Sequence, residues 1–406
     1  MKNLIAITLI LIGQSAFAQT FTNYTTADGL LNDNVNALDS DASNTLWFGT
    51  QSGLSQFDGT TWTDHTTTSD PGFIDNNVLA VHCMVNGDVW IGTDFGASIY
   101  SGGSWTSYTN ADGLANNQIK CISEDATGNV WFGTNVGASK FDGTTWTNIG
   151  TAQGLPFGGV VSIEEHSNGD MWLGTGLSGI QLYNGTLHTV IDESSNGLID
   201  NRIRAMVLEN NGFNWVATAD GITVLNNLNM FQTNYTTIFT LPPPDTLNPI
   251  EDIKANSQGH IWVGVYVDYL VTEGGVCAYN GQQWFQFEVA DGLVGPVVRQ
   301  LAIDGNDDVW VATSTGVSKI SFPNLGTNKL EYDQTFNLYP NPTSGSFTIA
   351  VNENSIGEKL SIYNAQMQLV QYEILSNEKL TLPTDKLNAG VYFVVIGGQT
   401  ERLIVK

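Results

Sequence analysis

The chain has 406 residues, 40 of them acidic and 14 basic, which gives a formal net charge of −26 at pH 7. Residues 19–322 carry 32 of the acidic and 7 of the basic side chains, so almost all of the excess negative charge lies there. A surface of this charge repels phosphate backbones and anionic bilayers, which excludes nucleic acid as an expected partner and an anionic membrane as an expected resting place.

The amino-terminal segment 1–18 is typical of a secretory signal peptide. A lysine precedes an apolar run at 4–12, and the small residues Ala16 and Ala18 stand before Gln19. We expect cleavage between Ala18 and Gln19. A membrane-spanning helix needs about 20 apolar residues. The run is shorter than that, so we expect no membrane span once the signal peptide has been removed.

Residues 19–322 contain a repeated motif in which a tryptophan opens a sequence of the Trp-Phe-Gly-Thr kind. The intervals between these tryptophans range from 41 to 48 residues. The seven of them are Trp47, Trp90, Trp131, Trp172, Trp215, Trp262 and Trp310. Such an interval is typical of one four-stranded blade and not of paired helices. The sequence therefore predicts an all-β fold that begins with a seven-bladed β-propeller over residues 19–322.

The third unit shows what each blade contains. Its predicted strands, from the innermost to the outermost, are 119–124, 130–134, 138–141 and 146–149. Tight turns such as Asp142-Gly143 supply the positive φ that hairpins require. A glycine recurs in the second strand of the units, at Gly49, Gly92, Gly133 and Gly174. We expect each of these glycines to leave room for an indole of the neighbouring blade.

The start of the propeller and its last unit complement each other. Residues 21–30 match residues 105–114 nearly position for position, yet they precede any complete unit. The last unit, in turn, has no outer strand of its own before residue 322. We expect the amino-terminal strand to become the outer strand of the seventh blade. Its hydrogen bonds would close the ring and remove two exposed sheet edges.

The order of short motifs within a unit points to a known repeat. Gly113-Leu114 is followed by Asn117-Gln118-Ile119 and then by residues 125–134, whose pattern is Asp-x-x-Gly-x-Val-Trp-x-Gly-Thr. This order resembles that of two-component regulator propeller repeats, and the likeness extends from about residue 21 to residue 322. In that family the propeller usually forms the sensor half of a membrane-bound histidine kinase. Because the sequence shows no kinase segment, we expect the fold without the signalling role.

The composition changes after about residue 331, where the tryptophan motif no longer occurs. Short alternating segments over 331–406 predict a small β-sandwich, and 323–330 is the predicted linker. Short motifs lie near both ends of this region. Their residues are Tyr339, Pro340, Asn341, Pro342, Gly345, Gly390, Tyr392 and Lys406.

These motifs resemble the type A sorting domain of the type IX secretion system, which is found in Bacteroidota. The resemblance implies that the type IX secretion machinery is a partner of the carboxy-terminal domain. It also implies export through the periplasm, passage across the outer membrane, removal of the tail, and then attachment at the cell surface or release. The alternative is an accessory sandwich that the mature protein keeps.

Residues able to support catalysis are sparse. The histidines are scattered, with no His-x-x-x-His spacing and no glycine-flanked serine elbow. Glu164-Glu165-His166 lie next to one another on a predicted strand, where neighbouring side chains point to opposite faces. Residues 304–308 imitate the start of a calcium loop but lack its sixth-position glycine and distal glutamate, so we interpret them as a turn. We predict no catalytic residue, no bound metal and no cofactor.

The three cysteines are Cys83, Cys121 and Cys277, which are too few and too widely spaced for a disulfide framework. All of them fall in predicted strands. We expect buried free thiols, with one disulfide as the alternative.

Two neighbouring insertions suggest a ligand site. Residues 237–249 precede the sixth unit and residues 265–275 interrupt it, and both connections lie on the same face of a propeller. We hypothesise that aromatic and acceptor side chains from both insertions meet at the rim of one mouth, as in a sugar or peptide site. They are Phe239, Asp245, Tyr266, Asp268 and Tyr269. The alternative is that the insertions have no role in binding.

Two classes of function are compatible with this sequence. The first is an exported, non-catalytic binding module for a glycan, peptide or matrix ligand, and this is the class that we favour. The second is an extracellular polysaccharide lyase or glycoside hydrolase with its site at the propeller mouth, because such folds also host enzymes. A convergent pair of carboxylates, or a histidine with a carboxylate, would separate the two.

Overall fold

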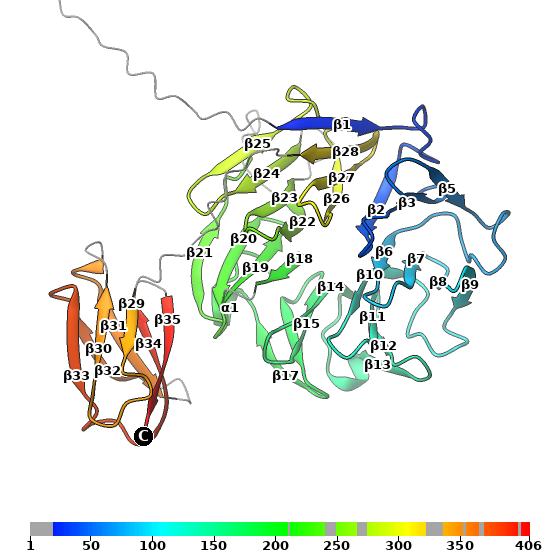
Figure 1. Cartoon of the computed structure of the whole chain (residues 1–406). Helices are drawn as coiled ribbons and strands as arrows, with labels where there is room; N and C mark the ends of the chain where they lie inside the picture. Colours follow the sequence, from blue (N-terminus) through cyan, green and yellow to red (C-terminus); the bar gives the residue numbers. More distant parts are fainter. Residues whose placement is uncertain are drawn as a thin grey trace, which may run out of the picture.

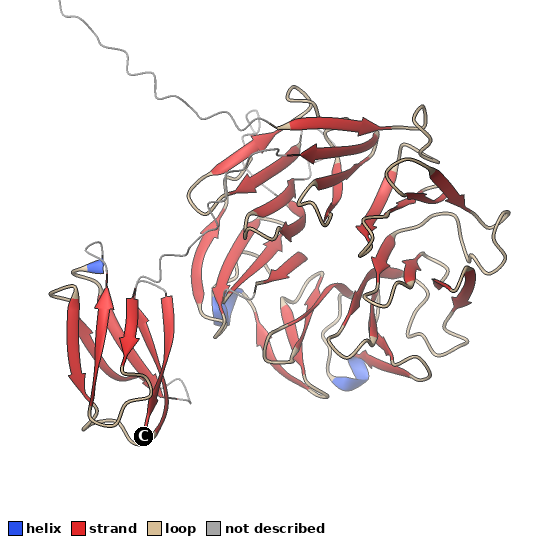
Figure 2. Ribbon diagram, in the orientation of Figure 1, coloured by secondary structure: helices blue, strands red, loops and turns tan. Residues whose placement is uncertain are grey.

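A computed structural model of the chain describes residues 19–209, 212–239, 249–265, 274–321, 336–351, 355–364, 369–396 and 399–406. Strands make up most of it (Figure 2). The helical segments among these residues are short, namely the 3-10 turn η1 (Thr151–Gln153) and α1 (Glu193–Asn196). No helix of the described residues is long and apolar enough to cross a membrane.

Residues 20–321 form seven four-stranded sheets, which is consistent with the predicted seven blades. The strands of the first four are β2 (Val35–Ser40), β3 (Leu46–Thr50), β4 (Gly53–Phe57), β5 (Trp62–His65); β6 (Ala80–Cys83), β7 (Val89–Gly92), β8 (Ala97–Ser101), β9 (Ser104–Tyr108); β10 (Ile119–Glu124), β11 (Val130–Thr134), β12 (Gly137–Phe141), β13 (Trp146–Gly150); and β14 (Val160–Glu165), β15 (Met171–Thr175), β16 (Ile180–Tyr183), β17 (Leu187–Ile191). Those of the last three are β18 (Ile203–Leu208), β19 (Phe213–Thr218), β20 (Gly221–Asn226), β21 (Phe231–Tyr235); β22 (Ile250–Ala255), β23 (Ile261–Val265), β24 (Gly275–Tyr279), β25 (Trp284–Phe287); and β26 (Val298–Ile303), β27 (Val309–Thr313), β28 (Gly316–Ser321), β1 (Thr20–Tyr24).

The innermost strands of the seven sheets are β2, β6, β10, β14, β18, β22 and β26, and together they surround a central axis (Figure 1). Each inner strand contacts the inner strand of the next sheet, and β26 of the last sheet contacts β2 of the first. The ring is therefore closed. The prediction for the third unit is confirmed for its first two strands; the third strand begins one residue earlier than expected and the fourth ends one residue later.

Closure by the amino-terminal strand is confirmed. Strand β1 pairs antiparallel with β28, so that Phe21 lies opposite Ile320 and Tyr24 opposite Val317. Asn23 adds side-chain bonds, since its Nδ2 donates to the Gly292 carbonyl at 3.0 Å. This pairing gives the seventh sheet its fourth strand and leaves it no open edge on that side of β28.

The motif tryptophans form the layers between blades, and each of them is at most 3% exposed. Trp310, for example, packs with Val35 and Phe48 of the first blade. The second-strand glycines do not face these indoles, so that expectation was wrong. A Cβ on Gly92 would lie 2.4 Å from Ile119 Cγ2 of the next inner strand, and neighbouring aliphatic side chains are likewise the nearest to Gly49 and Gly174.

In the first, third and last blades, the turn after the inner strand explains the aspartate of the repeat. Asp125 Oδ1 accepts bonds from the backbone N–H groups of Thr127 and Asn129, and its Oδ2 accepts one from Trp131 Nε1 at 2.9 Å. Asp304 does the same in the last blade. Its carboxylate therefore serves the turn, as interpreted, and the described residues contain no group of three metal-ligating side chains.

The carboxy-terminal region forms a separate two-sheet sandwich, as predicted. One sheet contains β29 (Phe336–Tyr339), β30 (Ser346–Val351) and β33 (Lys379–Pro383). The other contains β31 (Lys359–Asn364), β32 (Leu369–Ile374), β34 (Gly390–Ile396) and β35 (Gln399–Val405). Buried side chains from both sheets make a common core that includes Phe347 and Ile362. The predicted linker 323–330 and the signal peptide 1–18 with Ala16 and Ala18 lie outside the described residues.

The motif residues of this region hold its last strand and its turns. Asn341 Oδ1 accepts the Ile404 N–H at 2.9 Å, and the Lys406 N–H donates to the Thr343 carbonyl at 2.8 Å. The Gly345 carbonyl accepts the Thr384 N–H at 2.9 Å. The Tyr392 hydroxyl donates to the Asn388 carbonyl at 3.0 Å. The sequence from 339 to 345 is thus tied to the end of the chain.

Candidate functional site

The insertions that suggested a ligand site are described only in part. Asp245, Tyr266, Asp268 and Tyr269 lie outside the described residues. Phe239 is described and is only 2% exposed, so it is not a rim residue. It fills the space beside Gly275, where an added Cβ would lie 2.9 Å from its ring. Burial against the sixth blade removes Phe239 from the candidate ligand-binding side chains.

A different site emerges from an irregularity that the inner strands share. In six of the seven, pairing with the second strand slips by one residue near the start of the strand, which is the signature of a β-bulge. A bulge re-aims the extra side chain, and bulges are frequent beside functional sites. The extra residues are Asn36, Lys120, Val161, Arg204, Glu251 and Arg299.

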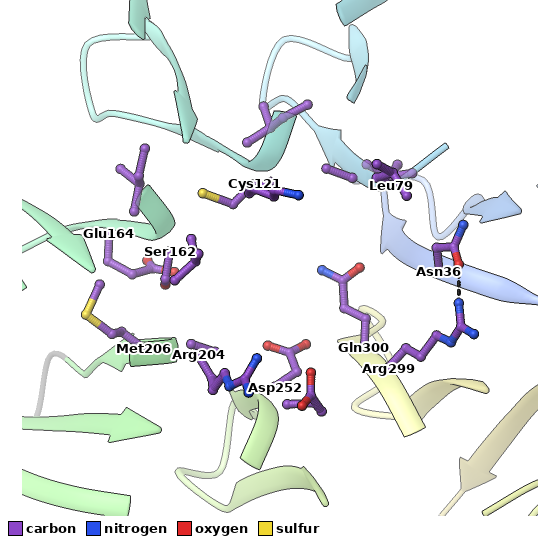
Figure 3. A pocket seen from close by; sticks show the side chains of 18 of the residues that line it. Asn36, Leu79, Cys121, Ser162, Glu164, Arg204, Met206, Asp252, Arg299 and Gln300 are labelled. Carbon is purple, nitrogen blue, oxygen red and sulfur yellow. Dashed lines mark hydrogen bonds between the residues drawn. The ribbon is translucent and has the colours of Figure 1, made fainter. Parts of the chain in front are cut away.

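All six bulge residues line one cavity on the axis of the propeller, together with Leu79 from the equivalent place before β6. The cavity has a volume of about 200 Å³ (Figure 3). We call these seven residues the mouth ring. Because they stand at the start of the inner strands, they lie at the face that carries the turns between second and third strands. Ser162, Asp252 and Gln300 follow one level deeper, and Glu164 and Lys254 deeper still.

The charge of the cavity differs from that of the domain around it. Lys120, Arg204, Lys254 and Arg299 line it, which is four of the seven basic side chains of residues 19–322. Its acidic residues number three, so only three basic side chains remain for the 29 acidic ones elsewhere in this region. More than half of the cationic groups of a strongly acidic domain therefore lie around its axis.

Neighbouring blades orient the cations of the mouth ring. Arg299 Nη1 donates to Asn36 Oδ1 across the junction of the seventh and first blades (Figure 3). Asn36 is itself fixed, because its Nδ2 donates to the Val78 carbonyl at 2.9 Å. Burial raises the pKa of Glu251, and the positive charges of Arg204 and Arg299 oppose that rise. Glu251 therefore stands between two arginines.

The deeper acidic groups serve the fold. Asp252 Oδ2 accepts the N–H of Leu301 on the next inner strand at 2.8 Å, and its Oδ1 lies 3.6 Å from Lys254 Nζ. The Asp252 carboxylate in turn raises the pKa of Lys254, with a smaller contribution from Glu164, so Lys254 stays protonated. Burial raises the pKa of Glu164 to about 7.

A histidine and a carboxylate meet on the first two inner strands. His82 Nδ1 lies 3.6 Å from Asp39 Oδ2, which also accepts the Cys83 N–H at 2.8 Å. Burial lowers the pKa of His82, so the imidazole is neutral at pH 7. The structure also brings the single residue Glu164, but not Glu165 or His166, to the cavity.

The cysteines take no part in such chemistry. All three are free thiols, as expected; Cys277 is buried, whereas Cys83 and Cys121 are half-buried. Cys121 lines the cavity, and burial raises its pKa to about 12, which keeps it protonated and unreactive.

Sequence reasoning missed the cavity because its residues are about 40 positions apart. One signal was available in hindsight. Each residue of the mouth ring precedes the motif tryptophan of its unit by 11 residues, so an alignment of the units collects Asn36, Leu79, Lys120, Val161, Arg204, Glu251 and Arg299 in one column.

Comparison with known proteins identifies parts of the chain. Residues 337–406 match the family described as secretion system C-terminal sorting domain. Residues 113–136 and 154–176 match the family described as two component regulator propeller. Both agree with the resemblances seen in the sequence.

Individual relatives are distant. The chain is 26% identical over 129 residues to β-agarase A of Zobellia galactanivorans, a stretch that covers 30% of this chain and 23% of the agarase. Among solved structures it is similar to PorZ, a surface component of the type-IX secretion system of Porphyromonas gingivalis, with a TM-score of 0.57 and 18% identity over 93% of this chain and 60% of PorZ. It is also similar to a streptogramin B lyase, with a TM-score of 0.55 and 16% identity over 75% of this chain and 97% of the lyase.

These likenesses establish the propeller fold and identify residues 337–406 as a sorting domain. The chain spans under two thirds of PorZ and about a quarter of the agarase, so the activities of those proteins are not assigned to it. Residues 113–136 and 154–176 thus carry two-component regulator propeller repeats within a β-propeller, and residues 337–406 form a type IX secretion system C-terminal sorting domain, which marks a protein that is secreted or attached at the outer-membrane surface.

Proposed function

We propose that this protein is an exported, non-catalytic binding module whose ligand enters the central cavity through the mouth ring. The observation that carries the proposal is the gathering of four of the seven basic residues of an acidic domain around one cavity. Of the mouth-ring cations, Lys120 and Arg204 are exposed and Arg299 is half-buried, so a ligand in the cavity can reach them. The mouth-ring cations face the cavity and are placed there by bulges, a device that is common at functional sites.

The rest of the domain supplies a rigid frame for such a site. Inner strands contact each other all the way round, and the first strand of the domain closes the ring. Side chains on strands of a closed ring lose little further freedom on binding, which lowers the entropic cost of capture. The sorting domain supplies the route: the type IX secretion machinery would export the module and leave it facing the surroundings of the cell.

An enzyme remains the second candidate, and one observation favours it. Glu164 lines the cavity, and burial raises its pKa to about 7. Groups that titrate near neutrality are suited to general acid–base catalysis. A polysaccharide lyase or a glycoside hydrolase would use such groups. Asp252 and Lys254, however, are engaged with the backbone and with each other, which leaves few groups free to act on a substrate.

One experiment separates the two candidates. The full mature chain is immobilised and incubated with a panel of polysaccharides, and both retention and the appearance of new reducing or unsaturated ends are measured. A binding module retains a ligand without cutting it. New chain ends that disappear in Glu164→Gln, a variant of similar shape without the acid, would contradict the proposal and support the enzyme.

A further inference from the structure

The mouth ring differs in charge from the acidic domain around it. It contains three cations, Lys120, Arg204 and Arg299, and a single acid, Glu251, so its net charge is positive. The remaining members are Asn36, Leu79 and Val161. In a domain with 32 acidic residues, a negatively charged group is repelled almost everywhere except at this opening. Clefts lined by one sign of charge concentrate ligands of the opposite sign.

The arrangement of the two arginines suits a carboxylate. Arg204 stands on β18 and Arg299 on β26, and Glu251 stands on β22, the inner strand between them. A guanidinium group presents a planar set of donors that matches a carboxylate with two parallel bonds. The positive charges of both arginines act on the Glu251 carboxyl group, and a carboxylate from a ligand would approach the same arginines from the open side of the cavity.

The size of the cavity and the acidic residues around it limit the ligand to one carboxylate group. The cavity holds about 200 Å³, which is space for a single terminal group or sugar ring. Outside it, the turns that join the blades on this face carry acidic residues, among them Asp28, Asp112 and Asp291, each of which accepts a backbone N–H of its own turn. A polyanion would meet these carboxylates, whereas a chain with one carboxylate at its end would not.

The neutral groups nearby favour a sugar over a peptide. The Ser162 hydroxyl and the Gln300 amide, whose Oε1 accepts the Leu38 N–H at 3.0 Å, line the cavity beside the cations and match the hydroxyl groups of a sugar. Phe95 and Phe157 lie on the same face, in the turn between β7 and β8 and in the segment before β14, and they are 63% and 84% exposed. Aromatic platforms beside polar groups are typical of saccharide sites.

We propose that the mouth ring binds the uronic-acid end of an oligosaccharide, with the carboxylate held by Arg204 and Arg299 and supported by Lys120. The inference rests on the proposed function and narrows its ligand to one class. The sugar ring lies against Ser162 and Gln300, and the rest of the oligosaccharide runs outward over the face that carries Phe95 and Phe157.

The test uses two oligosaccharides that differ only at the non-reducing end, which is glucuronic acid in one and glucose in the other. Binding to the full mature chain is measured by calorimetry. We expect the glucuronate probe to bind at least about tenfold more tightly, since charge-assisted hydrogen bonds are worth about 1.5–3 kcal/mol. Arg204→Gln and Arg299→Gln each reduce that affinity roughly tenfold or more. Arg204 is exposed, so its loss does not disturb the core.

Lys140→Gln is the matched control, because it removes one positive charge next to Trp131 and Asp125, at the opposite end of the inner strands. It is expected to bind the glucuronate probe as the native protein does. Equal binding of the two probes, or native affinity in both arginine variants, overturns the inference. If the propeller binds neither probe but captures a peptide through its free carboxyl terminus, the sugar assignment is wrong while the proposed function stands. Cleavage of the probe contradicts the proposed function itself.

Discussion

Replacing Tyr24 by alanine tests the closure of the ring. Tyr24 is on β1, and its ring lies 5.3 Å from Phe57, 5.5 Å from Trp310 and 5.9 Å from Trp62, measured between centroids. It thus joins β1 to the seventh and first blades. Truncation of a fully buried aromatic costs about 3–5 kcal/mol. Because Tyr24 is half-buried, we expect Tyr24→Ala to lower the free energy of unfolding by about 2–3 kcal/mol.

Tyr108→Ala provides the matched comparison. Tyr108 occupies the same place in the second blade, 5.5 Å from Trp90, 5.4 Å from Phe141 and 5.9 Å from Trp146. Its strand β9 is joined to β8 by a short hairpin, whereas β1 reaches β28 only by closing the whole ring. The two variants should lose similar stability in urea. Only Tyr24→Ala should also weaken the junction between β1 and β28.

The assay is hydrogen exchange, followed by mass spectrometry of the peptide that covers β28. A loss of about 2–3 kcal/mol in local stability speeds exchange by roughly 30-fold to 150-fold, at 1.4 kcal/mol for each factor of ten. The peptide that covers β8 in Tyr108→Ala should change less, because the hairpin keeps its partner strand in place. Unchanged exchange of β28 together with an unchanged urea midpoint in Tyr24→Ala would refute the closure mechanism.

Three further predictions concern packing and protonation. Gly92→Ala places a Cβ 2.4 Å from Ile119 and should lower the unfolding free energy in urea by about 1–3 kcal/mol, whereas Gly150→Ala, with nothing nearer than 3.4 Å, should be nearly neutral. Burial holds the pKa of Glu164 at about 7, above its unfolded value, so native stability falls as pH rises from about 4.5 to 7. Glu164→Gln should remove this slope, and a variant with the same slope as the native protein in urea titrations at pH 5 and pH 8 would contradict it. Burial opposes the ionisation of Asp125, but hydrogen-bond donors from its turn hold its pKa below the usual range, so its contribution to stability is lost only in strong acid. Asp125→Ala should lower the free energy of unfolding by about 1–3 kcal/mol at pH 7. An unchanged free energy of unfolding would contradict the role of Asp125 in the turn.

The blades could be predicted from the sequence because each one repeats the same local sequence features. Alternating apolar residues, the turn aspartate and the tryptophan motif act within about 40 residues, and they placed strands 119–124 and 130–134 to the residue. Closure was also predictable, since residues 21–30 repeat the outer-strand segment 105–114 and therefore had to complete some blade.

The cavity could not be predicted in the same way. A bulge adds one residue to a strand without changing its composition, so period-two alternation gives no sign that Arg204 or Arg299 turns towards the axis. The partner of each second-strand glycine was misjudged for a related reason. Which side chain faces Gly92 depends on the register between blades, and that register is set by packing of the closed ring, not by either segment alone.

The most direct test of the account compares two double variants that remove the same charge from different places. Arg204→Gln with Arg299→Gln empties the mouth ring of its arginines, and Lys140→Gln with Lys319→Gln removes two cations that lie beside Trp131 and Trp310. Affinity for the glucuronate-ended probe is measured at about 0.15 M salt, where charges are screened beyond about 8 Å. We predict roughly a hundredfold loss or more for the first pair and less than about a twofold change for the second. Equal losses in both would show that net charge, and not the mouth ring, governs binding.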